Sequence, residues 1–257
     1  MNISLKNPAE VEIIRQACRI QSEILNEVCA AVAIGISTSE LDELAEKLCR
    51  EKNVKPGFKN YHGFPASICA SVNDEVVHGI PSKNKILENG DIIAIDFGVV
   101  LDGWNADACR TVAVGKISEE AKKLMERTKE SLYRGIEKAV AGNSTGDIGH
   151  AIESFVKQFS YSPVRETVGH GIGRKLHEDP EVPNWGKVGS GAKLKKGMVI
   201  CIEPIINAGS AKILTEKDGW TTRTRDGKLS AHFEHQILIR EGEAEILTPW
   251  DEPVGNL

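Results

Sequence analysis

The sequence predicts an α/β (α+β) domain built from two similar halves, in which helices cover a central antiparallel or mixed sheet. Three features predict it: motifs repeated at one spacing, helix start signals before both copies, and paired apolar runs suited to buried strands. The chain has 257 residues, of which 40% are hydrophobic and 27% charged, as is typical of globular proteins. This length allows one large domain or two small ones.

The repeat is visible in two pairs of motifs. Residues 35–38 read GIST and residues 142–145 read GNST, an offset of 107 positions (142 minus 35). NGDIIAID at 89–96 and KGMVICIE at 196–203 differ by the same 107 positions (196 minus 89). Chance is the alternative explanation for such short strings, but two matches at one offset favour a duplication.

A third pair of motifs indicates that the two halves differ in loop length. HGIP at 78–81 and HEDP at 177–180 are offset by 99 positions (177 minus 78), eight fewer than the other pairs. We therefore expect a single domain over residues 1–257, with repeats at about 8–114 and 115–245.

Each repeat begins with signals for a helix. Residues 7–10, Asn-Pro-Ala-Glu, supply an N-cap, a first-turn proline and the glutamate of a capping box, and the apolar-periodic segment ends near Gly35. Ser118 caps the matching segment of the second repeat, which ends near Gly142. A second helix is expected after each G-x-S-T motif, with apolar positions at Leu41, Leu44, Ile148 and Ala151.

Two apolar runs, IIAI at 92–95 and VICI at 199–202, indicate strands that are buried on both faces. Each run is followed directly by an acid, Asp96 in the first half and Glu203 in the second. A carboxylate buried at such a position is costly unless it is paired or bound to a metal.

The first of these strands continues into a predicted hairpin. The Asp102-Gly103 pair is typical of a two-residue turn, which places Asp96 opposite Cys109 and Asp107 opposite Gly98. Asp96 and Asp107 then share one face of the sheet as diagonal neighbours, roughly 7–8 Å apart at the backbone. Two carboxylates at this separation can hold one or two cations between them.

A further strand is expected at SAHFEHQILI, residues 230–239, with Glu234 among apolar residues. Four acids at core strand positions repel one another strongly, so the pattern favours divalent cations of the Mn, Fe, Co or Zn type held together with an imidazole. The glycine-rich turn around His170 and His177 would let the backbone crowd that centre. One of these histidines would bind metal, and the other would project toward substrate as a proton donor.

Two other interpretations of the stretch VGHGIGRKLHEDP, residues 168–180, are excluded. An H-E-x-x-H zinc helix needs a second histidine, which is missing, and Pro180 would break the helix. The glycines at 169, 171 and 173 do not have the spacing of a dinucleotide-binding loop.

Taken singly, each acid has a structural explanation; Glu203, for example, could simply end a strand before Pro204. His232 and His235, which flank Glu234, are expected to be ordinary solvated side chains. His62 and His150 are expected to be structural.

Composition excludes several classes of protein. The net charge is −5 and the notable basic cluster, Lys193 with Lys195 and Lys196, is too small for a nucleic-acid surface. There is no apolar run long enough to span a membrane and no N-terminal secretory pattern. The six cysteines lack a C-x-x-C pair and are expected to be reduced thiols, so we expect a cytoplasmic protein.

Five motifs together resemble the type I methionine aminopeptidases: NDEVVHGIP, IDFGVVLDGWNADACRT, GHGIGRKLHEDP, IEP and FEHQILI. The resemblance covers nearly the whole chain. It implies the pita-bread fold, in which two pseudo-symmetric halves surround a dinuclear metal site.

The resemblance also implies a set of metal ligands. By matched motif they are Asp96, Asp107, His170, Glu203 and Glu234, with Asp107 and Glu234 bridging two divalent ions. Asp96 would complete one ion, and His170 with Glu203 the other. Co, Mn, Fe, Zn and Ni are all compatible with this set.

The implied activity is removal of the initiator methionine from nascent proteins and peptides, with a small second residue preferred. Glu203 is implied as the catalytic proton carrier, while His78 and His177 match the histidines that contact substrate and transition state. The partners would be the N-termini of nascent polypeptides. Contact with the ribosome would be transient, and the sequence shows no segment dedicated to it. Nothing in the sequence requires a partner subunit, so we expect a monomer.

The pocket for the first residue is the part that departs from the family pattern. Phe64 stands where the family commonly has tyrosine, Leu176 where it often has phenylalanine, and Phe58 where a cysteine can occur. The residues in the matching stretches are Tyr61, Phe64, Cys69, Leu176 and Trp220. Each aromatic could equally be plain core.

Rival families share the fold. Prolidase-like and aminopeptidase P-like enzymes usually carry an extra N-terminal domain, for which a first repeat beginning near residue 8 leaves no room. Type II methionine aminopeptidases usually carry an insertion in the second half, which the 107-residue offset leaves little space for. Non-catalytic or metal-free relatives have lost ligands, whereas all five are present here.

Overall fold

The computed structural model describes residues 3–250 and has a helix pair at the start of each half. Asn7 caps α1 through a capping box with Glu10, and Ser118 caps α3, as the sequence predicted. The helices are α1 (Pro8–Ala30), α2 (Thr38–Glu51), α3 (Glu119–Ile136) and α4 (Thr145–Val156), with short 3₁₀ turns η1 (Tyr61–Gly63) and η2 (Lys157–Phe159).

The strands pair in antiparallel ladders throughout the described residues, and the parallel pairing among them is an isolated bridge between Val140 and Arg240. The first half contributes β1 (Lys55–Pro56), β2 (Ile68–Val72), β3 (Glu75–Val77), β4 (Ile92–Leu101) and β5 (Trp104–Ala113). The second half contributes β6 (Ser162–Pro163), β7 (Gly169–Gly171), β8 (Glu178–Val182), β9 (Val199–Ile202), β10 (Ile205–Asn207), β11 (Ile213–Thr215), β12 (Thr222–Thr224), β13 (Ser230–His232), β14 (His235–Leu238) and β15 (Glu245–Ile246).

The β4–β5 hairpin has the predicted register. Leu101 pairs with Trp104 around the Asp102-Gly103 turn, Asp96 pairs with Cys109, and Gly98 pairs with Asp107. Both turn residues have positive φ, which aspartate tolerates and glycine favours. The hairpin therefore delivers Asp96 and Asp107 to one face, as expected.

Matching hydrogen bonds relate the two halves. Gly35 N donates to Leu87 O at 2.8 Å, and Gly142 N donates to Leu194 O at 3.0 Å. Bridges between Ser37 and Ile86 and between Ser144 and Lys193 repeat the same geometry. Every member of each pair lies 107 positions from its counterpart, so the helix–strand connection is built twice in the same way.

The eight-residue difference also has a structural counterpart. Val72 pairs with Ile93 between β2 and β4, and Gly171 pairs with Ile200 between β7 and β9. The β4 and β9 residues differ by 107 positions, whereas the β2 and β7 residues differ by 99. The segment before β7 is thus eight residues shorter than the segment before β2. The segment between His177 and β9 is longer than its counterpart by the same amount.

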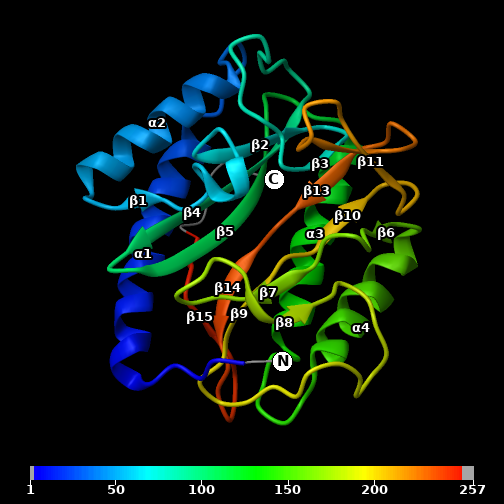
Figure 1. The fold of residues 1–257 in the computed structure, drawn as a ribbon. Helices are drawn as coiled ribbons and strands as arrows, with labels where there is room; N and C mark the ends of the chain where they lie inside the picture. Colours follow the sequence, from blue (N-terminus) through cyan, green and yellow to red (C-terminus); the bar gives the residue numbers. More distant parts are fainter. Residues whose placement is uncertain (1–2, 251–257) are drawn as a thin grey trace.

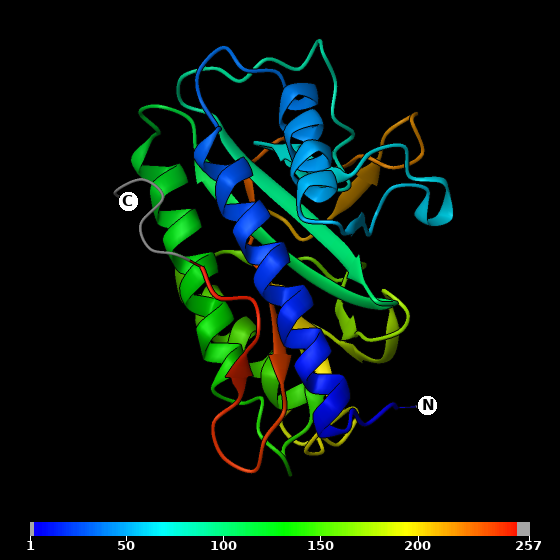
Figure 2. The same cartoon turned by 90° about the vertical axis from the view of Figure 1, so that its left-hand side faces the viewer.

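Each half has its own hydrophobic core, and the strands lie between them. One core joins α1 and α2 to β2, β4 and β5, and the other joins α3 and α4 to β9 and β14. Figure 1 shows the two helix pairs against the strands, and in the turned view of Figure 2 the blue α1 lies along the green β4–β5 hairpin. Ile200 and Ile202 enter one core while Val199 and Cys201 enter the other, so VICI is buried on both faces as predicted.

Two expectations about local structure are wrong. The predicted strand at 230–239 is interrupted at Phe233 and Glu234, because Glu234 N turns to donate to Cys109 O on β5 at 2.9 Å. Residues 169–171, expected in a turn, form strand β7 between β8 and β9.

The predictions about membrane-spanning segments and about the cysteines concern the whole chain. Within residues 3–250, none of the helices is both long and apolar enough to cross a bilayer. All six cysteines are buried and free, in agreement with the predicted reduced thiols.

Candidate active site

A cavity of about 890 Å³ opens between the two halves, and the residues predicted for the site all line it. Its walls come from η1, β2–β5, the β7–β8 turn, the end of β9 and the β11–β12 hairpin. The predicted residues at its surface are Tyr61, Phe64, Cys69, His78, Asp96, Asp107, His170, Leu176, His177, Glu203, Trp220 and Glu234. The structure therefore brings together side chains that are up to 173 positions apart (234 minus 61).

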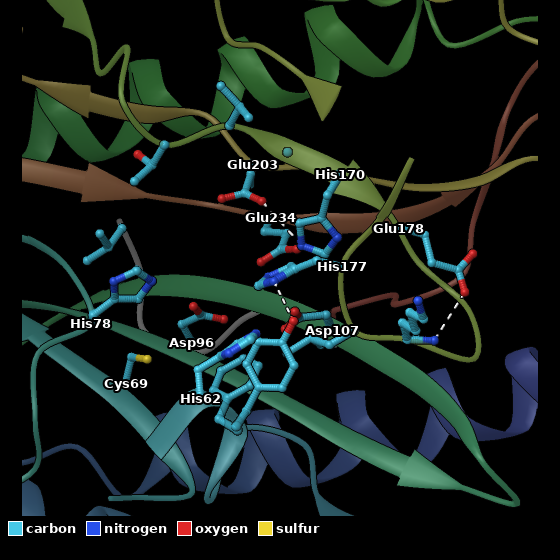
Figure 3. Close-up of a pocket in the computed structure, with 18 of the residues that line it drawn as sticks. His62, Cys69, His78, Asp96, Asp107, His170, His177, Glu178, Glu203 and Glu234 are labelled. Carbon is cyan, nitrogen blue, oxygen red and sulfur yellow. Dashed lines mark hydrogen bonds and ion pairs between the residues drawn. The ribbon is translucent and has the colours of Figure 1, made fainter. Parts of the chain in front are cut away.

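The second half supplies three of the converging groups. His170 lies on β7, Glu203 follows β9 directly, and Glu234 lies between β13 and β14. The Nε2 atom of His170 is 3.6 Å from Oε1 of Glu203. Figure 3 shows Glu203 and Glu234 facing Asp96 and Asp107 of the β4–β5 hairpin across the cavity.

Glycines let the backbone of β7 pack closely enough to place His170. A Cβ atom on Gly169 would overlap the carbonyl oxygen of Cys201, and one on Gly171 would overlap that of Asp179. The prediction that these glycines permit close packing is thus correct, although the segment is a strand.

The surroundings of the four acids and of His170 disfavour the charged form of each side chain. Burial raises the pKa of Asp96 to about 7. Burial and the neighbouring acids also raise the pKa values of Asp107, Glu203 and Glu234 well above their ordinary range. Burial lowers the pKa of His170 to about 3, so its imidazole is neutral and its lone pair is available.

The donor set fits a divalent cation. Oδ1 of Asp96, Oδ1 of Asp107 and Oε1 of Glu234 are buried without a hydrogen-bond partner among the described residues. Asp107, His170 and Glu234 each offer a ligand atom within 4.8 Å of the others, and the thiol of Cys201 lies inside the same group. Unpaired buried carboxylate oxygens beside a neutral imidazole suit Mn, Fe, Co or Zn.

His177 lies beside this cluster and is held from two sides. Its Nδ1 atom is 2.9 Å from the Tyr61 hydroxyl, and its ring meets that of His170 edge to face at 4.4 Å between centroids. Figure 3 shows His177 directed into the cavity between Asp107 and His170.

His78 occupies the other side of the cavity in a strained backbone conformation. Its φ of 58° lies in the left-handed region, which non-glycine residues rarely adopt. Its ring meets that of Trp220 edge to face at 6.1 Å between centroids. Strain of this kind is typical of residues whose side chains must point in one direction.

The apolar wall of the cavity is formed by the predicted pocket residues. Phe64 and Trp220 meet edge to face at 5.2 Å between centroids, with Leu176 and Phe58 also at the surface. The Cys69 thiol is neutral because burial raises its pKa well above the ordinary value. The wall can therefore accept an apolar side chain.

The structure corrects the expectations for two histidines. His232 and His235 are 2% and 1% exposed, so the expectation that they are solvated is wrong. His232 lines the cavity, as does the exposed His62 that was expected to be structural, whereas His235 stacks on Trp250. The spacing of two residues between His232 and Glu234 is the signal that could have placed His232 at the site.

The duplicated fold and the buried carboxylate–imidazole cluster define a metal-dependent hydrolase. The profile of "Metallopeptidase family M24" matches residues 12–241. The methionine aminopeptidase of Clostridium acetobutylicum is 51% identical and methionine aminopeptidase 1 of Bacillus subtilis is 48% identical. Each alignment covers 96% of this chain and at least 98% of the relative.

Solved structures agree with this relationship. The methionine aminopeptidase of Thermotoga maritima superposes with a TM-score of 0.94 at 41% identity, over 96% of this chain and 99% of that one. The prolidase of Pyrococcus horikoshii, at 23% identity and a TM-score of 0.79, shares the fold. The chain belongs to metallopeptidase family M24 and, within it, to the methionine aminopeptidases.

Proposed function

We propose that the protein removes the initiator methionine from nascent proteins and peptides, with a preference for a small second residue. The observation that carries the proposal is the convergence of two buried acids, two half-buried acids and His170 at one end of a cavity whose other wall is apolar. The names and high identity of the relatives support the same activity.

Two divalent ions would be held by Asp96, Asp107, His170, Glu203 and Glu234, with Asp107 and Glu234 shared between them. The unpaired oxygens of Asp107 and Glu234 support this assignment, and these two residues offer ligand atoms within 4.8 Å of each other. When bound, such ions supply Lewis acidity and lower the pKa of water toward neutrality. Several first-row metals suit these ligands.

Glu203 would carry the proton in the reaction. A carboxylate with a raised pKa accepts a proton from the attacking water and can return it to the departing amine near neutral pH. Its position at the end of β9 faces both His170 and the open part of the cavity.

His177 and His78 would contact the substrate from opposite sides of the cavity. When the Tyr61 hydroxyl donates to Nδ1 of His177, Nε2 carries the proton and can donate to the scissile carbonyl oxygen as negative charge develops there. His78 would donate to the substrate amide or accept from it. Burial lowers the pKa of both rings, which keeps them neutral.

The methionine side chain would occupy the apolar wall formed by Tyr61, Phe64, Cys69, Leu176 and Trp220. Both halves contribute to this cavity, so we propose a single catalytic domain over residues 1–257 with repeats at about 8–114 and 115–245. We further propose a cytoplasmic monomer that meets its substrates at or near the ribosome.

The test is release of methionine from the peptide Met-Ala-Ser by the metal-free protein supplied with Mn²⁺ or Co²⁺. Glu203→Gln and His177→Ala should each reduce turnover about 100-fold or more, the scale expected for a general acid–base group or an oxyanion donor. Met-Leu-Ser should be cleaved much more slowly than Met-Ala-Ser. Binding of Met-Ala-Ser without release would instead favour a peptide-binding protein.

A further inference from the structure

His232 is a buried histidine at the active site for which the proposed reaction has no use. It is 2% exposed, it lines the cavity, and its Nε2 atom has no hydrogen-bond partner among the described residues. An unpaired polar atom at this depth is costly to maintain. The neighbouring group is the carboxylate of Glu203, the proposed proton carrier.

The Nε2 atom of His232 faces one oxygen of Glu203, and His170 faces the other. His232 Nε2 is 3.8 Å from Oε2 of Glu203, while His170 Nε2 is 3.6 Å from Oε1. In Figure 3, His170 lies to one side of Glu203 and His78 to the other. The two oxygens of Glu203 therefore have different neighbours.

The duplication places His232 at the position that Asp107 occupies in the first half. Gly90 N donates to Val114 O, and Gly197 N donates to Ile239 O in the same way. Equivalent residues of β5 and β14 are therefore 125 positions apart (239 minus 114). The same offset carries Asp107 to residue 232 (107 plus 125). One half thus uses this position for a carboxylate, and the other half has an imidazole there.

We propose that His232 is a positioning residue for Glu203, whose Nε2–H donates to Oε2 and so leaves Oε1 directed toward His170 and the metal side. The inference rests on the proposed function, because it assigns a task to a side chain beside the proton carrier. It adds a member to the site that the matched motifs did not contain.

Three observations support a direct contact between these groups. A separation of 3.8 Å is too short for a water molecule to bridge. Catalytic hydrogen bonds are often long in the free enzyme and shorten when the site is loaded. The imidazole of His232 can hold a proton on Nε2, which is the ring nitrogen nearest to Oε2 of Glu203 and has no other partner among the described residues.

The test compares His232→Gln, which keeps a side-chain donor, with His232→Leu, which fills the space without one. Methionine release from Met-Ala-Ser should fall about 10–100-fold in kcat for His232→Leu, with little change in KM, and should be largely restored in His232→Gln. Calorimetric titration of the metal-free proteins with Mn²⁺ should show weaker binding for His232→Leu by a similar factor. His235→Leu is the matched control, since it removes an equally buried histidine that contacts Trp250 and Thr248.

A second measurement depends on neither metal nor turnover. Long-range ¹H–¹⁵N correlation spectra of the metal-free protein should show the proton of His232 on Nε2. A proton on Nδ1, or His232→Leu matching the wild type in both kcat and Mn²⁺ affinity, overturns the inference. A wild-type protein that neither binds Mn²⁺ nor releases methionine contradicts the proposed function instead, while the tautomer still decides whether His232 donates.

Discussion

At the scale of single residues, the contact between Tyr61 and His177 sets what the active-site histidine can do. Tyr61 comes from the 3₁₀ turn η1 in the first half, and His177 comes from the β7–β8 turn in the second. The 2.9 Å contact at Nδ1 leaves Nε2 free to act toward the cavity. A hydrogen bond across the two halves thus holds the ring through Nδ1, and it favours a proton on Nε2 when the hydroxyl is the donor.

Tyr61→Phe should lower kcat about fivefold, because removal of a hydrogen bond worth about 1 kcal/mol lets the His177 ring change its orientation. Steady-state kinetics with Met-Ala-Ser measures the effect. Tyr133→Phe, a change on helix α3 in the second core, is the control. Equal kcat in wild type and Tyr61→Phe would show that His177 is held by its other neighbours.

Residue positions were predictable from sequence where a turn fixed the register, and not where burial had to be known. Asp96 and Asp107 were placed correctly because the Asp102-Gly103 turn determines which residues of the hairpin face each other. His232 and His235 were misjudged because their sequence neighbours do not reveal that β13 and β14 pack between two cores.

At the scale of elements, the β7–β8 turn that carries His177 is anchored by the N-terminal segment. Lys6 Nζ pairs with Oε2 of Glu178 at 2.8 Å, and these side chains are 2% and 14% exposed. The other oxygen of Glu178 accepts from Lys175 N, inside the turn, and Lys6 N donates to Gly197 O. The turn is therefore fixed to the rest of the molecule by an ion pair adjacent to His177.

Lys6→Met should lower the free energy of unfolding by about 3 kcal/mol, since it leaves the largely buried Glu178 without its partner. Denaturant unfolding measures this loss, and kcat should fall together with stability because the turn positions His177. Lys6→Arg keeps the charge and should retain most of both. Equal stability of the two variants would contradict the anchoring role.

The second helix of each half begins with the same reciprocal cap. In α4, Asp147 Oδ2 accepts from the Ser144 hydroxyl at 2.6 Å and from Ser144 N at 2.7 Å, and Ser37 with Glu40 forms the equivalent box in α2. The Ser144 hydroxyl is the main cause that holds the pKa of Asp147 below its ordinary value. A lowered pKa in the folded state means that ionised Asp147 stabilises the fold.

Asp147→Asn should therefore reduce stability at neutral pH, by less than about 1 kcal/mol because the exposed carboxylate is screened by water. The stabilisation is fully present above the ordinary pKa of 3.8 and is lost as pH falls through the lower folded-state pKa. The difference in unfolding free energy between wild type and variant should hence begin to close once the pH falls below 3.8. A difference in unfolding free energy that grows as the pH falls would contradict the expected pH dependence.

Elements were predictable where local signals were strong. The capping boxes and the repeated G-x-S-T motifs located all four long helices correctly, since these signals act within one turn. The break at Phe233 and Glu234 was not predictable, because it results from a hydrogen bond to β5, which lies 125 positions away at Cys109 (234 minus 109).

At the scale of the whole molecule, the cluster of acids works against the stability of the metal-free fold. Four carboxylates converge between two otherwise well-packed cores. Burial raises the pKa values of all four, and repulsion by neighbouring acids raises those of Asp107, Glu203 and Glu234 further. Such a cost is typical of sites where function requires charges that folding disfavours.

Asp107→Asn should therefore raise the melting temperature of the metal-free protein, by about 2–4 °C for each kcal/mol of relieved repulsion. The same change should abolish the further rise that Mn²⁺ produces in the wild type by binding the folded state. Calorimetric scans with a chelator and with Mn²⁺ measure both effects. Asp102→Asn, at the tip of the same hairpin, should change neither, and a lower metal-free melting temperature for Asp107→Asn would contradict the repulsion.

The unequal loops of the two halves affect how an extended peptide can align in the cavity. A perfect twofold arrangement would offer an extended peptide two equivalent alignments, one the reverse of the other. Here the longer connection before β2 brings Tyr61 and Phe64 to the cavity, while the shorter one before β7 brings Glu166, Thr167 and Val168. The two halves therefore line the cavity with different side chains, so the two alignments of an extended peptide are not equivalent.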